Sequence, residues 1–246
     1  MSRLRLLPFA LCALLAATLL FRPAIAAATL LTVTNPSFEN PATGPATFVV
    51  STTAGPFGWS AYNTTAANNQ RSFGVWNPAT TLSYVNGAPH GANIGVVFLM
   101  NTTGIAEAGL QQTLAATLQL STQYTLTVEV GNFSPADNGP FAFAGFPGYR
   151  VDLLAGGTVI ASDANTLAPG EGIFATSTVT FTTLGSHPQA GQTLGIRLVS
   201  LNGPGTEVNF DNVRLDATAV PEPTTAFLSF LGLLAATFRR PRRAAR

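Results

Sequence analysis

Apolar and polar residues alternate with a period of two along most of the chain between residues 29 and 219. The pattern is clear in residues 124–130, where Tyr, Leu, Val and Val alternate with Thr, Thr and Glu, and it recurs in residues 149–153. A period of two is typical of a half-buried β-strand. Further candidate strands, in chain order, are residues 30–33, 47–50, 59–62, 73–76, 92–99, 159–162, 174–182, 194–200 and 208–215.

Clusters of Gly, Pro, Asn and Asp separate these candidates, and Gly156-Gly157 lies between two short strands. Because glycine supplies the positive φ that tight turns need, this pair predicts a β-hairpin. No convincing amphipathic helix and no internal repeat interrupts the series. Threonine-rich strands at short, regular spacing predict an all-β fold, an antiparallel jelly-roll β-sandwich.

The last strand candidate breaks its own alternation. Val208 and Phe210 share one face, whereas Val213 and Leu215 have the opposite parity. One extra residue near Asp211, accommodated as a β-bulge, lets both pairs of apolar side chains face the same side of the sheet. A bulge also changes the direction of a side chain.

Both ends of the chain differ from this domain. Residues 1–28 have a positive start, an apolar stretch from Leu6 to Phe21 and a small-residue site at Ala24-Ile25-Ala26, as in a signal peptide with its helix. Residues 220–246 contain two prolines two residues apart, then the short apolar segment 224–238, then a cluster of arginines. The segment spans roughly 22 Å as a helix, which is short for a permanent membrane span. The folding domain is therefore predicted to be residues 29–219.

In order and spacing, the tail resembles the PEP-CTERM sorting signal of Gram-negative bacteria. The resemblance implies transient insertion in the inner membrane, processing by an exosortase-type membrane protease, and delivery to the cell surface or extracellular matrix. An ordinary C-terminal anchor is the alternative. The residues implicated in sorting are Pro221, Glu222, Pro223, Arg239, Arg240, Arg242 and Arg243.

Charge and cysteine content change once the ends are set aside. The domain keeps four arginines, no lysine and ten acidic residues, a net charge of about −6, although the whole chain carries +1. Such a domain lacks the basic residues that meet phosphates, which argues against a nucleic-acid partner. The single cysteine, Cys12, lies in the signal segment, so the predicted domain has no disulfide and depends on its core.

Two motifs near the ends of the domain are 35–40 (Asn-Pro-Ser-Phe-Glu-Asn) and 208–215 (Val-Asn-Phe-Asp-Asn-Val-Arg-Leu). Together with residues 110–114 and 124–131 they resemble carbohydrate-binding modules of the galactose-binding-like type. In such modules a structural calcium joins the first and last strands, which implicates Glu39 and Asp211 as ligands. Calcium takes six to eight oxygens, so backbone or amide oxygens must complete the set. The alternative is that both carboxylates only cap turns.

A sugar site also needs exposed aromatic rings that stack on pyranose faces. The candidates are Trp76, at a predicted strand end, and Phe143, Phe146 and Tyr149, in a Gly/Pro-rich segment. Trp59 is interpreted instead as a core residue.

Enzyme signatures are weak. His90 and His187 lie in predicted loops without metal-ligand spacing, and no nucleophile elbow is present. The sequence therefore predicts an exported, non-catalytic protein that binds extracellular polysaccharide. A structural or adhesion matrix protein without a sugar site is the first alternative. A secreted glycan hydrolase is the second, because two carboxylates suffice for that chemistry.

Overall fold

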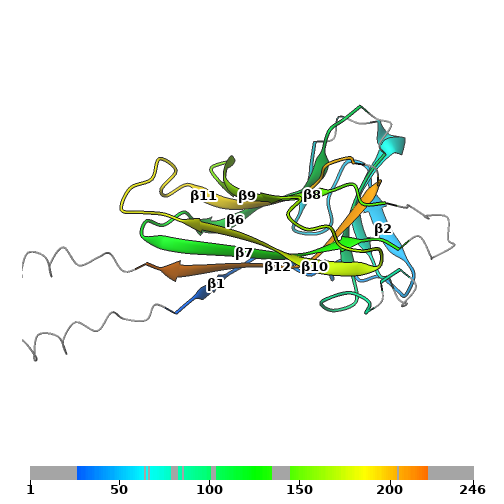
Figure 1. Ribbon diagram of the computed structural model, residues 1–246, viewed down its shortest axis with the longest axis horizontal. Coiled ribbons are helices and arrows are strands. Elements are labelled where there is room, and N and C mark those ends of the chain that lie inside the picture. The colour runs from blue at the N-terminus through cyan, green and yellow to red at the C-terminus, as the bar shows by residue number, and fades with distance from the viewer. Residues whose placement is uncertain are drawn as a thin grey trace, which may run out of the picture. The chain divides into compact units, whose positions relative to one another are not determined.

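The computed structural model describes residues 27–63, 65, 67–78, 83–84, 86–100, 104–134, 145–203 and 205–220. A compact unit from Ala28 to Thr218 consists of two antiparallel β-sheets (Figure 1). The described residues contain one helix, the single 3-10 turn η1 (Asn68–Gln70). None of their helices has the length and apolar character needed to cross a membrane. The prediction of an all-β antiparallel sandwich is confirmed.

Sheet A has seven strands and contains both the first and the last strand of the unit. Its order is β10-β7-β12-β5-β4-β2, and β1 also pairs with β12. The strands are β1 (Thr29–Leu31), β2 (Phe48–Ser51), β4 (Arg71–Trp76), β5 (Ile94–Leu99), β7 (Thr122–Asn132), β10 (Ile173–Thr182) and β12 (Glu207–Ala219).

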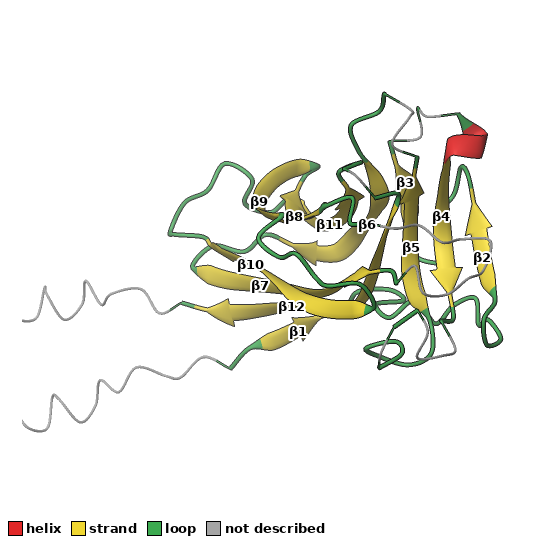
Figure 2. Ribbon diagram, turned by 45° about the vertical axis from the view of Figure 1, so that its right-hand side comes forward, coloured by secondary structure: helices red, strands yellow, loops and turns green. Residues whose placement is uncertain are grey.

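Sheet B has five strands in the order β3-β6-β11-β8-β9 and forms the second layer (Figure 2). Its strands are β3 (Ser60–Tyr62), β6 (Ala108–Thr117), β8 (Tyr149–Ala155), β9 (Thr158–Ala164) and β11 (Thr193–Ser200).

The core lies between the two sheets and follows from the period of two. In β7, Leu126, Val128 and Val130 are buried in the core cluster, and Ile196 and Leu198 of β11 belong to the same cluster. Burial of each such side chain stabilises the fold by about 1.5 to 3 kcal/mol. Trp59 is also in this cluster, as predicted from the sequence.

Two local predictions are confirmed in detail. Gly156 and Gly157 have φ values of 57° and 80° and join β8 to β9 in a hairpin that pairs Ala155 with Thr158. In β12, Phe210 and Val213 are both buried, and Asn212 between them has a φ of 48°. The extra residue therefore lies next to Asp211, as predicted from the change in alternation.

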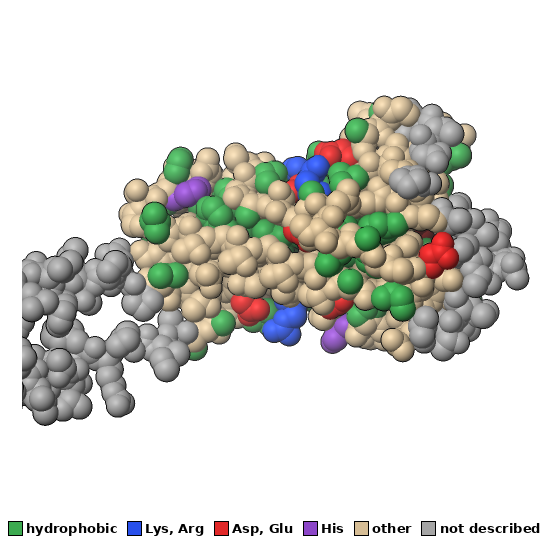
Figure 3. Space-filling model, in the orientation of Figure 1, with side chains coloured by type: hydrophobic (Ala, Val, Ile, Leu, Met, Phe, Trp, Pro, Cys, Tyr) green, Lys and Arg blue, Asp and Glu red, His purple; other side chains and the backbone are tan. Residues whose placement is uncertain are grey.

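Few charged side chains are present on the face of the molecule shown in Figure 3, and they lie in small separate groups. This distribution agrees with a chain in which only 9% of the residues are charged. The predicted signal helix, the sorting helix and the seven sorting residues, Pro221 to Arg243, lie outside the described residues. The exosortase partner and the location beyond the inner membrane therefore stay predictions.

Candidate functional site

Strand β12 presents a row of polar side chains on the face of sheet A that turns away from sheet B. Val208 and Phe210 point into the core, so the alternating residues Glu207, Asn209 and Asp211 point to the opposite face. All three are buried all the same, with exposed fractions of 9%, 0% and 0%. Buried polar groups on a sheet surface need partners, and these partners define the candidate site.

Four aromatic rings from different elements gather beside this row. Trp76 ends β4, Tyr84 lies between β4 and β5, Phe133 follows β7, and Phe174 lies in β10. The ring centroids are 4.3 Å apart for Tyr84 and Phe174, 5.2 Å for Trp76 and Phe133, and 6.2 Å for Trp76 and Tyr84. We call these four residues the aromatic cluster.

Hydrogen bonds join the aromatic cluster to the polar row. The Tyr84 hydroxyl donates to Oδ1 of Asn209 at 2.5 Å, and Nδ2 of Asn209 donates to Oε1 of Glu207 at 2.9 Å. A phenol, an amide and a carboxyl group are thereby connected in one chain of contacts next to aromatic surface.

The environment of Glu207 alters its acidity. Burial raises its pKa to about 7, and the hydrogen bond from Asn209 partly opposes this rise. Burial, together with the nearby Glu207 charge, also raises the pKa of Tyr84 well above its usual value, so this phenol stays protonated. Glu207 is therefore present in both protonation states near neutral pH, as a group that donates and recovers a proton must be.

Gly131 of β7 allows the rings to lie close to the sheet. A Cβ atom at this position would stand 2.5 Å from a Phe174 ring atom and 2.7 Å from the Tyr84 hydroxyl. Real Cβ atoms do not approach other atoms so closely, so only glycine leaves both rings in place.

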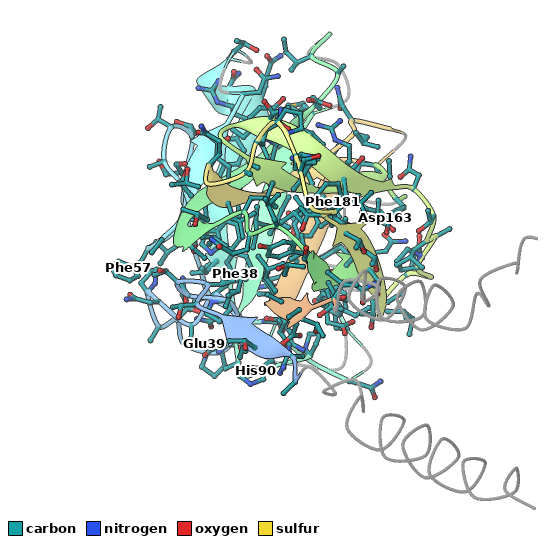
Figure 4. The ribbon with its side chains drawn as sticks, turned by 90° about the vertical axis from the view of Figure 1, so that its left-hand side faces the viewer. Phe38, Glu39, Phe57, His90, Asp163 and Phe181 are labelled. Atoms are coloured by element: carbon teal, nitrogen blue, oxygen red, sulfur yellow. The ribbon has the colours of Figure 1, made fainter. Side chains whose placement is uncertain are left out.

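Glu39 and Asp211, the two predicted metal ligands, bind the same loop. Oε1 of Glu39 accepts from the amides of Ala92 and Asn93, and Oδ2 of Asp211 accepts from the amide of His90. Figure 4 shows Glu39 and His90 side by side. Burial, first of all, and the Glu39 charge raise the pKa of Asp211 to about 8.

These two carboxylates are thus neighbours, although the described residues contain no group of three or more His, Cys, Asp or Glu side chains that could hold a metal ion. A metal at this place would need oxygens of other kinds.

The predicted aromatic sugar ligands are dispersed. Trp76 is half-buried and belongs to the aromatic cluster. Tyr149 is fully buried, with its hydroxyl donating to Asp163 at 2.6 Å, so it is not an exposed ring. Phe146 packs partly buried against the core, 6.2 Å from Tyr149, and Phe143 lies outside the described residues.

Sequence reasoning missed five members of the site: Glu207, Asn209, Tyr84, Phe133 and Phe174. The signal available was the polar alternation 207, 209, 211 on a strand whose other face is apolar. Alternation predicts an outward face but does not show that loops and rings bury it, because those residues are distant in sequence.

The model of the HpiC1-like family, described as HpiC1 cyclase, matches residues 29–216. The chain belongs to the HpiC1-like family. No curated protein matches the chain.

Solved structures that are similar to this chain include cyclases from Fischerella sp. TAU. The Stig cyclase Fisc, in complex with (3Z)-3-(1-methyl-2-pyrrolidinylidene)-3H-indole, is 38% identical with a TM-score of 0.70, covering 79% of this chain and 100% of its own. A cyclase in complex with 4-(1H-indol-3-yl)butan-2-one is 38% identical with a TM-score of 0.66, covering 78% and 99%. A galactotriose-bound carbohydrate-binding module also matches, but at 11% identity and a TM-score of 0.44 it carries no functional argument.

Membership of the HpiC1-like family corrects the functional predictions. The prediction of a non-catalytic protein is wrong, because the family and its solved relatives are cyclases. The same matches contradict the prediction of a polysaccharide-binding matrix protein. They also contradict its two alternatives, a structural or adhesion protein and a glycan hydrolase. They give no support to a sorting tail or a biofilm role. The error arose because one sandwich architecture supports both binding modules and enzymes.

Proposed function

We propose that the protein is a cyclase that closes a ring on an unsaturated substrate bearing an indole or a similar flat aromatic group. The observation that carries this proposal is the buried carboxyl group of Glu207 beside the aromatic cluster. Family membership supports the reaction class, and the indole-containing ligands of the two Fischerella cyclases support the substrate class.

The aromatic cluster suits the binding step. Flat rings from four elements offer stacking and edge contacts to an indole, and such contacts contribute about 0.5 to 1.5 kcal/mol per pair beyond area burial. The same ring faces attract a positive charge that develops during ring closure. Trp76 and Phe174 are half-buried, so they are the rings of the cluster with surface left for a ligand.

Glu207 suits the proton-transfer step. Its carboxyl group donates a proton to an unsaturated carbon or a ring nitrogen of the substrate, and the O–H bond breaks as the new bond to hydrogen forms. The resulting cation is attacked by an electron-rich carbon of the same molecule, which closes the ring. Loss of a proton from the cyclic cation returns the proton to the Glu207 carboxylate, so the overall reaction is an isomerisation.

Ligand binding tests the proposal through Gly131. We expect the wild-type chain to bind 4-(1H-indol-3-yl)butan-2-one and to convert indoles with unsaturated side chains into cyclic isomers of equal mass. Gly131→Ala is expected to weaken binding at least tenfold, because the new methyl group displaces Phe174 and Tyr84. Isothermal titration calorimetry measures the binding, and chromatography with NMR identifies the products.

Gly170→Ala is the matched control, since a Cβ there meets only Ile173 at an ordinary 3.9 Å. If the wild-type chain neither binds the indole ketone nor forms a cyclic isomer from any indole substrate, the proposed function is wrong.

We also propose that Glu39 and Asp211 hold a structural calcium ion, as predicted from the sequence. Asp211 is a fully buried carboxylate, and Glu39 raises its pKa further, so a cation at this place would relieve an electrostatic cost. The two carboxylates fit the oxygen chemistry of calcium, with backbone and water oxygens to complete the set. The ion would supply positive charge that ties the loop at His90 to β12.

Removal of calcium tests this site. Binding at a hundredfold excess over Kd stabilises the folded state by about 2.7 kcal/mol, so a chelator should lower the Tm by about 5 to 10 °C. Asp211→Asn should abolish the chelator effect, whereas Asp216→Asn, on the same strand, should retain it. A wild-type melting curve that is the same with and without chelator would rule the site out.

We also propose that the sandwich is a jelly roll. A jelly roll is supported by the way the chain crosses between layers, since β3 of sheet B lies in sequence between β2 and β4 of sheet A, and β6 lies between β5 and β7. The absence of a nucleic-acid partner stays a prediction from composition.

A further inference from the structure

The amide of Asn209 is fully buried and contacts groups from its own strand, from β5 and from the loop between β4 and β5. Its Oδ1 accepts from the Tyr84 hydroxyl at 2.5 Å. Its Nδ2 donates to Oε1 of Glu207 on the same strand at 2.9 Å and to the carbonyl of Gly95 on β5 at 3.3 Å. Every hydrogen-bonding direction of this side chain except one lone pair is therefore used.

The orientation of the amide is fixed by its neighbours. The Gly95 carbonyl can only accept, so the atom that faces it must be the NH2 group. Oδ1 then faces Tyr84, and the Tyr84 hydroxyl has to be the donor. The second N–H of the amide is left for Glu207, and it approaches Oε1.

We propose that Asn209 is a positioning residue for proton transfer, because it occupies Oε1 of Glu207 and leaves Oε2 as the oxygen that carries and delivers the proton. The inference rests on the proposed cyclase function. When the Oε2–H bond breaks and the proton moves to the substrate, the electron pair stays on the carboxylate. The N–H of Asn209 then stabilises this carboxylate, so donation and recovery occur at the same oxygen.

The surroundings of Glu207 allow this role. Among the described residues, the titratable group whose charge state is coupled to that of Glu207 is Tyr84, which stays neutral near pH 7. Strand β5 places Phe98 opposite Glu207 in the register, and Phe98 does not titrate. The amide of Asn209 is thus the group that favours the charged form of Glu207 against burial, which favours the neutral form.

A titration of the full chain without substrate tests the inference. Carbon-13 NMR of the glutamate side-chain carboxyl groups follows each protonation with pH, and Glu207→Gln assigns the Glu207 signal by its loss. Removing the amide in Asn209→Leu should move the Glu207 midpoint upward by about one pH unit, a tenfold gain in proton affinity.

Gln112→Leu is the matched control. Gln112 is a buried amide of β6 that donates to the carbonyls of Thr34 and Gly58, so its loss perturbs the fold without touching Glu207. The Glu207 midpoint should not move in this variant. A purely structural role for Asn209 would give both variants the same midpoint as the wild type.

Tyr84→Phe is the second variant, and it decides the question if Asn209→Leu does not fold. It removes only the hydroxyl that holds the amide in place, so the Glu207 midpoint should again move upward. An unchanged midpoint in the variants that fold overturns the inference. Because no substrate is used, this result is independent of whether the wild-type chain shows cyclase activity.

Discussion

Replacing Glu207 with glutamine is expected to lower cyclase turnover by about 100- to 10,000-fold, the usual contribution of general acid–base catalysis. Glutamine keeps the size of the side chain and its contact with Asn209, but it has no carboxyl proton to donate. Wild-type turnover should fall as the pH rises above about 7, because the proton donor is the neutral form of Glu207.

The measurement is product formation from an indole substrate across a pH series, with folding checked by circular dichroism. Glu171→Gln is the control, since Glu171 is exposed in the segment that precedes β10. Turnover in Glu207→Gln within threefold of the wild type would remove Glu207 from the mechanism.

Replacing Trp59 with alanine is expected to lower the free energy of unfolding by about 3 to 5 kcal/mol, as large-to-small substitutions in protein cores do. The Trp59 ring is stacked on Phe38 with centroids 5.5 Å apart, and its Nε1 donates to the carbonyl of Asn35 at 3.2 Å. The substitution leaves a cavity next to Phe38 and removes one of the two hydrogen bonds that the Asn35 carbonyl accepts, the other coming from the Phe38 amide.

Urea denaturation followed by far-ultraviolet circular dichroism measures this loss without relying on tryptophan fluorescence. Phe57→Ala, two residues away, is the control, because Phe57 is 61% exposed and its loss should cost less than about 0.5 kcal/mol. Equal losses in the two variants would show that Trp59 is not part of the core.

The period of two was sufficient to predict the layers of this fold, since burial of alternate residues is a local property of strands. It located the β8–β9 hairpin at Gly156-Gly157 and the irregularity near Asp211. The site was harder to predict because Tyr84 lies in a loop and reaches Asn209 across 125 positions of sequence. A single amino-acid sequence does not show that these two residues are in contact.

The same limit explains why Tyr149 was wrongly predicted as an exposed ring and why Glu207 was missed. Tyr149 lies at the end of a Gly/Pro-rich segment, which suggested that its ring is exposed. In the structure its hydroxyl donates to a buried oxygen of Asp163, which also accepts from Ser177. Glu207 was not singled out from the sequence, and it precedes the predicted strand 208–215 by one residue. Its altered pKa arises from burial by distant residues, so no local pattern distinguishes it from Glu129 or Glu171.

The irregularity at Asn212 divides β12 into two segments with opposite phase. The segment before it carries Glu207, Asn209 and Asp211, and the segment after it pairs with β1 through Leu215 and Ala217. A one-residue deletion before Asn212 would exchange the two faces of this segment. Glu207, Asn209 and Asp211 would then point into the core in place of Val208 and Phe210. A deletion between Asn212 and Leu215 would shift the pairing with β1 and would also turn Leu215, a residue of the core cluster, away from the core. The extra residue at Asn212 is thus what lets both segments of one strand direct their apolar side chains into the same core.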